Sequence, residues 1–268
     1  MSIISTSPAE AGLQLDVGRS RVPFTRTVRV ELRKMFDTRS GFWLVASIAI
    51  AALLATVITI LVAPDAQLHY YTFAKAVGFP MTVILPMIAA LAITGEWSQR
   101  SGLTTFTLNP NRSQVIGAKV AASILVAVAS MALAFVIGAV GNVVGSAVAG
   151  VDQVWNVSLE HGFAIVVAHL VGLLTGTMLG MVMRNSPAAL VSYFIYALVL
   201  PTLSGLLAAS QQWYAHAQDW VDVNAAQAAF FEGSPSAGQS AHLASAAGIW
   251  VALPGILGLW LVMRSEVR

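Results

Sequence analysis

The chain has 268 residues, of which 57% are hydrophobic and 10% are charged, with a formal net charge of +2 and no cysteine. A typical soluble domain has about a quarter of its residues charged, so this composition excludes an ordinary soluble domain and indicates a polytopic membrane protein. Without cysteine the chain can form neither disulfides nor thiolate metal sites, so helix packing alone has to hold the fold together.

The segment before the first apolar run divides into two parts. Residues 1–22 are polar and without pattern, so we expect a disordered N-terminal arm. In residues 23–40 the apolar side chains recur at helical spacing, with basic residues on the other faces; they are Phe24, Val28, Leu32, Met35 and Phe36. This pattern predicts an amphipathic helix lying in the inner membrane interface. The alternative is a solvated basic helix that only sets topology.

Six windows of about 20 mostly apolar residues follow, each long enough to cross a bilayer core of roughly 30 Å as a helix. They cover approximately 42–63, 76–94, 116–140, 162–183, 187–208 and 244–263. The backbone amides of a single segment in lipid can only be satisfied within a helix. The predicted fold is therefore an all-α membrane protein, with a six-helix transmembrane domain in residues 41–268.

The distribution of basic residues predicts the orientation. Thirteen of the 14 lysines and arginines fall on one side of the predicted spans, and only Lys75 falls on the other. Because basic residues near span ends are retained in the cytoplasm, we expect both termini to be cytoplasmic. The long connection at residues 209–243 then forms an outer loop.

Capping residues indicate where two of the spans begin. Asn111 followed by Gln114 resembles a capping box that opens the third span. Ser186-Pro187 reads as a cap residue followed by proline at the first helical position, so the fourth and fifth spans are expected to be antiparallel neighbours.

The chain shows no energy source of its own. No acidic residue falls inside a predicted span, where an ion-coupled carrier usually keeps one. None of the lysines follows a glycine, as the phosphate-binding loop of an ATPase requires. If the protein does work, the energy has to come from another subunit.

The polar segment at residues 95–114 lies between the second and third spans and contains Glu96, Trp97, Arg100 and Phe106. Trp and Arg are typical anchors of protein interfaces, so a docking element for a soluble partner is one interpretation. An interfacial helix with Trp97 at headgroup depth is the other. The spacing alone leaves the two open.

Two stretches together resemble the membrane subunits of type 2 ABC transporters: ELRKMFDTRSGFW before the first span and GEWSQRSGLTTFTLNPNRSQVIGAK after the second. The likeness begins with an acidic-aromatic pair, Glu96-Trp97, and a following basic residue, Arg100. It continues with a Thr-rich run at Thr104-Thr105, the Pro-x-Arg of Pro110 and Arg112, and Ala118-Lys119. Many relatives have a basic residue and a Gly-Thr step where this chain has Ser98 and Ser101-Gly102. The six-span layout extends the likeness over nearly the whole chain.

The resemblance implies a permease subunit of an ATP-driven exporter in the plasma membrane, with an apolar or amphipathic substrate. Two six-span subunits, identical or different, would form the pathway, and two separate ATPase chains would bind ATP and Mg; membrane lipids are expected partners and nucleic acid is not. The interfacial helix would be the family's elbow helix. The expected ATPase-coupling residues are Glu96, Trp97, Arg100, Phe106 and Arg112. Because the second and fifth spans face the central cavity in this family, the expected pathway-lining residues are Phe79, Tyr193 and Tyr196, with packing aromatics as the alternative.

Small residues and one histidine stand out within the spans. Gly172, Gly176 and Gly180 recur every four residues, a spacing that lets helices approach closely; we favour packing within the chain over a subunit interface. His169, near a span centre, is interpreted as a neutral side chain bonded to a helix carbonyl or hydroxyl rather than a substrate or proton site. We expect no metal site, because His216 and Asp219 in the outer loop offer only two ligands.

Two other functions remain as alternatives. An intramembrane enzyme needs a nucleophile and base, or several metal ligands, converging within the membrane, and the spans offer only His169 and hydroxyls such as Ser192 and Ser204. A permease-like sensor or immunity protein acting with an ATPase is the other alternative. For the permease itself we expect no catalytic residue and no cofactor in this chain.

Overall fold

The computed structural model describes residues 22–37, 39–98 and 111–264, except for the side chain of Ser40. The described residues are mostly helical and contain no strand. Six helices are long and apolar enough to cross a membrane, which confirms the predicted multi-pass membrane protein. Residues 1–21 of the predicted disordered arm, together with Arg100 and Phe106, lie outside the described residues.

The helices follow one another along the chain with few interruptions. A short helix, α1 (Phe24–Asp37), precedes the first span, α2 (Arg39–Val62), and a 3₁₀ turn, η1 (Asp65–Gln67), joins α2 to the second span. The second, third and fourth spans are α3 (Tyr70–Ser98), α5 (Arg112–Ala149) and α6 (Leu159–Met183). The remaining elements are α7 (Ser186–Phe194), η2 (Ile195–Val199), α8 (Leu200–Ser210), α9 (Gln212–Val221), α10 (Val223–Glu232), α11 (Ala237–Ala247), η3 (Gly248–Ala252) and α12 (Leu253–Arg264).

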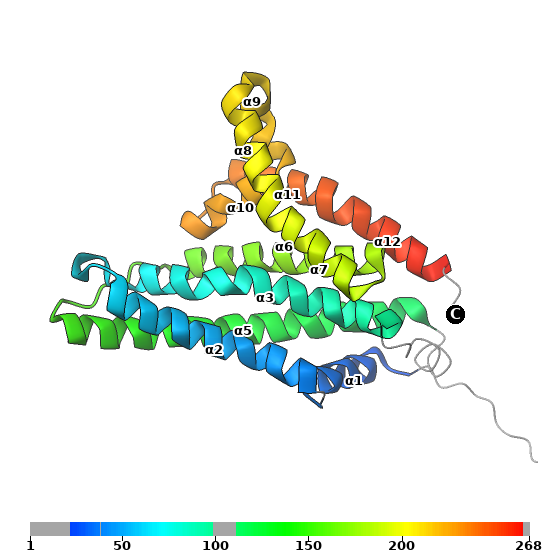
Figure 1. Cartoon of the computed structure of the whole chain (residues 1–268), viewed down its shortest axis with the longest axis horizontal. Coiled ribbons are helices and arrows are strands. Elements are labelled where there is room, and N and C mark those ends of the chain that lie inside the picture. The colour runs from blue at the N-terminus through cyan, green and yellow to red at the C-terminus, as the bar shows by residue number, and fades with distance from the viewer. Residues whose placement is uncertain (1–21, 38, 99–110, 265–268) are drawn as a thin grey trace, which may run out of the picture.

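Four long helices form the centre of the molecule. Figure 1 shows α2, α3, α5 and α6 side by side, with α8 running obliquely away from them. α12 also lies at an angle to them but packs against α6. α3 is the central helix and packs against α2, α5, α6 and α7. The core between these helices is apolar, with fully or nearly fully buried side chains such as Ile48, Met81, Leu85 and Leu173.

The fifth and sixth spans are much less buried than the fourth. Only 11% and 17% of the residues in their most apolar stretches are buried within the chain, against 56% in α6. Both spans contain a π-helical turn near the middle, η2 and η3, followed directly by Leu-Pro. A proline ring clashes with the carbonyl four residues earlier, and the wider π turn gives Pro201 and Pro254 the space they need.

The predicted outer loop is largely helical. It folds into α9, α10 and the start of α11. α10 packs on α6 through Ala164, Ala168, Val223 and Phe230, and α11 packs on α10. At the opposite end of the bundle the described chain ends come together. The Phe24 ring lies against Gly117 near the start of α5, and Arg112 donates to the Val262 carbonyl of α12. We call this end, which carries α1, the α1 end.

The predicted helix caps are right in one place and wrong in two. Asn111 caps α5, with its side chain accepting from the Gln114 amide as predicted. The Gln114 side chain, however, does not complete a capping box, because it donates to the Val22 carbonyl and to Thr27. The cap of α7 is Asn185, not Ser186, whose hydroxyl instead contacts those of Thr94 and Ser98 in α3.

Glycines let α6 approach α3 most closely at Pro86. A Cβ atom at Gly176 would overlap the Pro86 carbonyl oxygen and lie 2.7 Å from the carbonyl carbon. At Gly180 it would lie 3.0 Å from the Ala90 carbonyl oxygen, and at Gly172 it would have an ordinary contact of 3.6 Å with the Pro86 ring. All three glycines therefore face α3, and Gly176 tolerates a side chain least.

We predict that Gly176→Ala destabilises the protein while the matched Gly172→Ala does not. The Gly176 substitution forces the backbones of α6 and α3 apart, at a cost of about 1–3 kcal/mol or more. Alanine at 172 fits and favours the helix by up to about 1 kcal/mol. Thermal unfolding of both variants in detergent measures the difference; equal midpoints would contradict the close approach at Pro86.

Candidate functional site

A buried cluster of four charged side chains joins three helices at the α1 end. The Lys119 ammonium of α5 lies 2.7 Å from Glu31 Oε2 of α1 and 3.0 Å from Glu96 Oε1 of α3. Lys34 of α1 lies 2.8 Å from Glu31 Oε1 and 3.4 Å from Glu96 Oε1. Both lysines thus bridge the same two carboxylates. We call Glu31, Lys34, Glu96 and Lys119 the charge cluster.

The cluster is largely closed to solvent. The side chains of Glu31, Glu96 and Lys119 are only 5–6% exposed, whereas that of Lys34 is 46% exposed. Removing a charge from water costs several kcal/mol unless partners and hydrogen bonds replace the water. Two acids and two bases leave the cluster without net charge, and charge-assisted hydrogen bonds connect them. Each buried member therefore depends on the others.

Lys34 remains protonated over the whole physiological pH range. Burial alone lowers the pKa of its ammonium, but the hydrogen bond to Glu31 and the charges of Glu31 and Glu96 hold that pKa above its ordinary value. A raised lysine pKa stabilises the fold below the pKa of an unfolded lysine, about 10.4. This contribution is lost only as the pH rises through the folded pKa, so the charge of Lys34 does not respond to pH near neutrality.

The helix α1 turns a polar face toward the bundle. Its buried residues are Thr27 and Glu31, and Lys34 reaches the cluster from the next turn of the same face. Gln114 at the start of α5 donates to Thr27 at 3.1 Å. The apolar residues Phe24 and Phe36 are about half exposed, at 48% and 49%. Hydrogen bonds and ion pairs thus attach α1 to the bundle, together with the contact of Phe24 with Gly117.

The predicted coupling residues that the structure describes lie at the same end. Glu96 is in the last turn of α3 and belongs to the charge cluster. Trp97 is partly buried and packs beside Ile93, Ile116 and Val262, and the Arg112 guanidinium lies 3.3 Å from the Val262 carbonyl. Three of the five predicted residues are therefore brought together around the ends of α3, α5 and α12. Their contact with an ATPase stays a prediction.

The expected pathway residues lie in different environments. Phe79 on α3 is 76% exposed, and Tyr196 packs at the edge of the contact between α6, α10 and α11. Tyr193 is buried, and its hydroxyl donates to the Thr82 carbonyl of α3. In a regular helix the N–H of residue 86 would donate to the Thr82 carbonyl, but Pro86 has no N–H. Tyr193 supplies the missing donor and ties α7 to α3.

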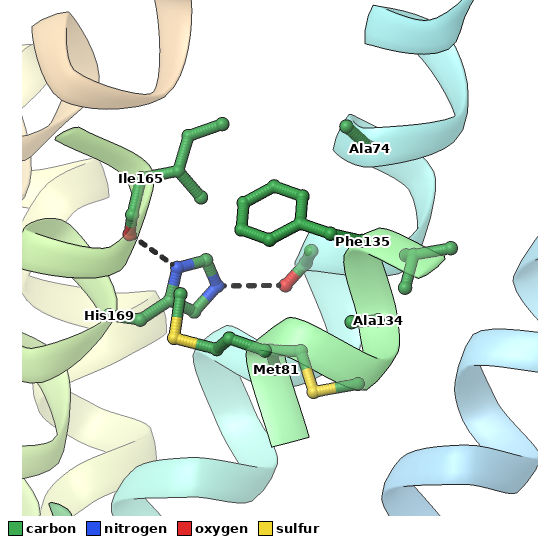
Figure 2. A pocket seen from close by; sticks show the side chains of 9 residues that line it. Ala74, Met81, Ala134, Phe135, Ile165 and His169 are labelled. Carbon is green, nitrogen blue, oxygen red and sulfur yellow. Dashed lines mark hydrogen bonds between the residues drawn. The ribbon is translucent and has the colours of Figure 1, made fainter. Parts of the chain in front are cut away.

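His169 lies between two backbone carbonyls in a small pocket. Its Nδ1 is 2.8 Å from the Ile165 carbonyl oxygen, and its Nε2 is 3.2 Å from that of Gly78. Figure 2 shows these contacts and the apolar side chains around the ring, among them Met81 and Phe135. A neutral imidazole has a single N–H and can donate to only one carbonyl at a time. The Ile165 contact lies within α6, and the Gly78 contact joins α6 to α3 when Nε2 carries the proton, as expected for a histidine with a structural role.

The described ranges contain no group of three or more His, Asp or Glu side chains able to hold a metal ion.

The sequence did not predict that Glu31 and Lys34 pair with Lys119 and Glu96. A signal was present, because Thr27, Glu31 and Lys34 share one helical face, separate from the apolar residues. The predicted second span ended at residue 94 and so left Glu96 in the connection, whereas Glu96 lies in the last turn of α3.

We predict that Lys119→Met destabilises the protein by about 3–5 kcal/mol, because it leaves two buried carboxylates facing a single lysine. The control Arg33→Met removes an exposed ion pair with Asp37 and should cost less than about 1 kcal/mol. Adding Glu96→Gln to Lys119→Met restores charge balance and should recover part of the loss. Denaturant unfolding in detergent measures all three. A Lys119→Met protein as stable as Arg33→Met would contradict the closed cluster.

A second prediction concerns the carbonyl that Pro86 leaves unpaired. Tyr193→Phe should cost about 1–3 kcal/mol in the native background, since Thr82 then loses its donor. In a Pro86→Ala background residue 86 regains an N–H that can bond Thr82, so the same substitution should cost clearly less. The double-mutant cycle gives a coupling energy directly. No coupling between residues 86 and 193 would show that Tyr193 does not replace the missing helix bond.

Comparison with known proteins does not show a family. No protein-family model matches the chain, and no curated protein matches its sequence. What the structure does show is a multi-pass membrane protein whose α1, α3 and α5 are joined by buried charges. Membership of the type 2 ABC transporter permeases therefore stays a prediction from resemblance.

Proposed function

We propose that this chain is the membrane-spanning permease subunit of an ATP-driven exporter in the plasma membrane. It forms half of a translocation pathway with a second permease, identical or different, and a separate ATPase supplies the energy from ATP and Mg. Both termini lie in the cytoplasm, where 13 of the 14 basic residues fall. α1 is the elbow helix in the inner membrane interface, and the substrate is apolar or amphipathic.

The charge cluster is the observation that carries this proposal. Segment 99–110, which resembles the coupling segment of the family, connects the end of α3 to the start of α5, and the cluster ties those two helices to each other and to α1. A force applied to that segment by a soluble partner acts directly on a rigid junction rather than on a loose loop. Such a junction suits a chain that contains no energy source and receives motion from another protein.

The arrangement of α3 supports the same proposal. α3 lies at the centre of the bundle, contains Pro80 and Pro86, and packs directly against α6 and α7. Any movement of its end at Glu96 is transmitted along a helix that contacts most of the bundle. This is the connection that an ATP-driven permease needs between a cytoplasmic partner and the middle of the membrane.

The proposal predicts which end of the chain meets the ATPase. A photo-crosslinking amino acid at Ser98, the last residue of α3, should capture a nucleotide-binding protein, whereas one at Val148, exposed at the opposite end of α5, should not. The purified chain alone should not hydrolyse ATP. Arg100→Glu, which reverses a charge in the segment, should reduce co-purification of the ATPase.

Two outcomes would contradict the proposal. Crosslinks from position 98 that reach only lipid would remove the docking assignment, and transport by the purified chain without an ATPase would remove the permease assignment. An intramembrane enzyme would instead lose its activity on His169→Ala. That substitution should leave an ATP-driven exporter active.

A further inference from the structure

Each side of α1 meets a different environment. Successive residues of a helix turn by about 100°, so the buried residues Thr27, Glu31 and Lys34 occupy one side. A second side carries the apolar residues Phe24, Val28, Leu32, Met35 and Phe36. The third carries the exposed arginines Arg26, Arg29 and Arg33. α1 thus has a protein-facing, an apolar and a cationic side, roughly a third of a turn apart.

The position of α1 along α5 indicates its depth in the membrane. α5 has 38 residues, about 57 Å at 1.5 Å per residue, and is longer than the hydrocarbon core of roughly 30 Å. α1 contacts α5 at Gln114, Gly117 and Lys119, within its first eight residues. The polar residues of this stretch mark it as lying outside the core. α1 therefore lies at the level of the lipid headgroups.

The exposed charged surface of α1 is cationic. Of its acids, Glu31 is buried in the charge cluster, and Asp37 pairs with Arg33 at 3.3 Å in an exposed contact that contributes little. Arg26 and Arg29 are exposed on the same side. The neighbouring start of α2 adds exposed aromatic side chains, Phe42 at 52% and Trp43 at 63%, of the kind that lie at membrane interfaces.

We infer that the cationic side of α1, formed by Arg26, Arg29 and Arg33, binds the headgroups of anionic phospholipids. Guanidinium groups match phosphate oxygens in geometry and charge, and basic side chains near a membrane surface are attracted to anionic lipid. An acidic protein surface fits less well. The arginines border a half-exposed apolar side, and a helix with both features is typical of a membrane surface.

The charge cluster gives this binding a consequence inside the protein. Anionic lipid binds the cationic side of α1 and so holds this helix in place. The protein-facing side of the same helix supplies Glu31 to Lys119. Lys119 in turn holds Glu96 at the end of α3. Anionic lipid therefore stabilises the junction next to segment 99–110. This inference rests on the interfacial placement of α1 proposed above but is independent of the assignment to an ATPase.

The test compares thermal unfolding midpoints of the full chain in nanodiscs of phosphatidylcholine and of phosphatidylcholine with phosphatidylglycerol. We expect the anionic lipid to raise the midpoint by about 2–4 °C. The variant Arg26→Gln/Arg29→Gln/Arg33→Gln should lose this rise while keeping the native midpoint in phosphatidylcholine. The matched variant with lysine at all three positions keeps the charge and should retain most of the rise. About 0.5 M salt should reduce it.

Each contrary outcome is distinct. No rise in the native protein, or a rise that persists in the glutamine variant, would overturn the inference. A glutamine variant that loses co-purification of an ATPase but shows an unchanged lipid response would assign this side of α1 to an acidic protein instead. Because the chain has no cysteine, Phe36→Cys places a single fluorophore on the half-exposed apolar side of α1. Failure of lipid-borne quenchers to reach it would show instead that α1 is not in the interface, whatever partner drives transport.

Discussion

The arrangement of the α1 end depends on the two ion pairs that Lys119 forms, one with Glu31 and one with Glu96. Lys119 is buried inside α5, and its ammonium has to be balanced by Glu31 from α1 and Glu96 from α3. If α1 moved away, the remaining carboxylate and Lys119 would lose a partner and meet either lipid or water. Separating any one of the three helices would therefore expose a buried charge, in addition to the apolar contacts that Ile93 and Ile116 make between α3 and α5.

A different kind of contact fixes the middle of α3. Pro86 leaves the Thr82 carbonyl without its helix partner, Tyr193 of α7 donates to that carbonyl, and Gly176 brings α6 against the Pro86 backbone. α3 is thus attached at its end by the ion pair of Glu96 with Lys119. Near its centre it is attached by the hydrogen bond from Tyr193 to the Thr82 carbonyl. Both contacts lie on α3, which runs from the coupling segment to the membrane interior under the proposed function. They provide a route by which movement of the Glu96 end of α3 reaches α7.

The number of spans was predictable from the sequence because hydrophobic length is a local property, and caps such as Asn111 could be found in the same way. The charge cluster could not be derived so easily. Glu31 and Lys119 are far apart in the sequence, and a buried ion pair depends on which helix faces meet. The apolar stripe of α1 was visible, but the residues that the helix buries against the bundle are the polar Thr27 and Glu31. The role of Tyr193 likewise required knowing which residue of α7 reaches the carbonyl freed by Pro86.

Amide hydrogen exchange in Lys119→Met tests most directly whether buried charge holds α1 to the bundle. Exchange reports the local opening of each helix separately. Loss of Lys119 should raise the exchange rate of Phe24–Asp37 by at least about tenfold, which corresponds to 1.4 kcal/mol, while the central part of α6 remains protected. If α1 keeps the protection that it has in the native protein, the charge cluster is not what fixes this helix, and the account of the α1 end is wrong.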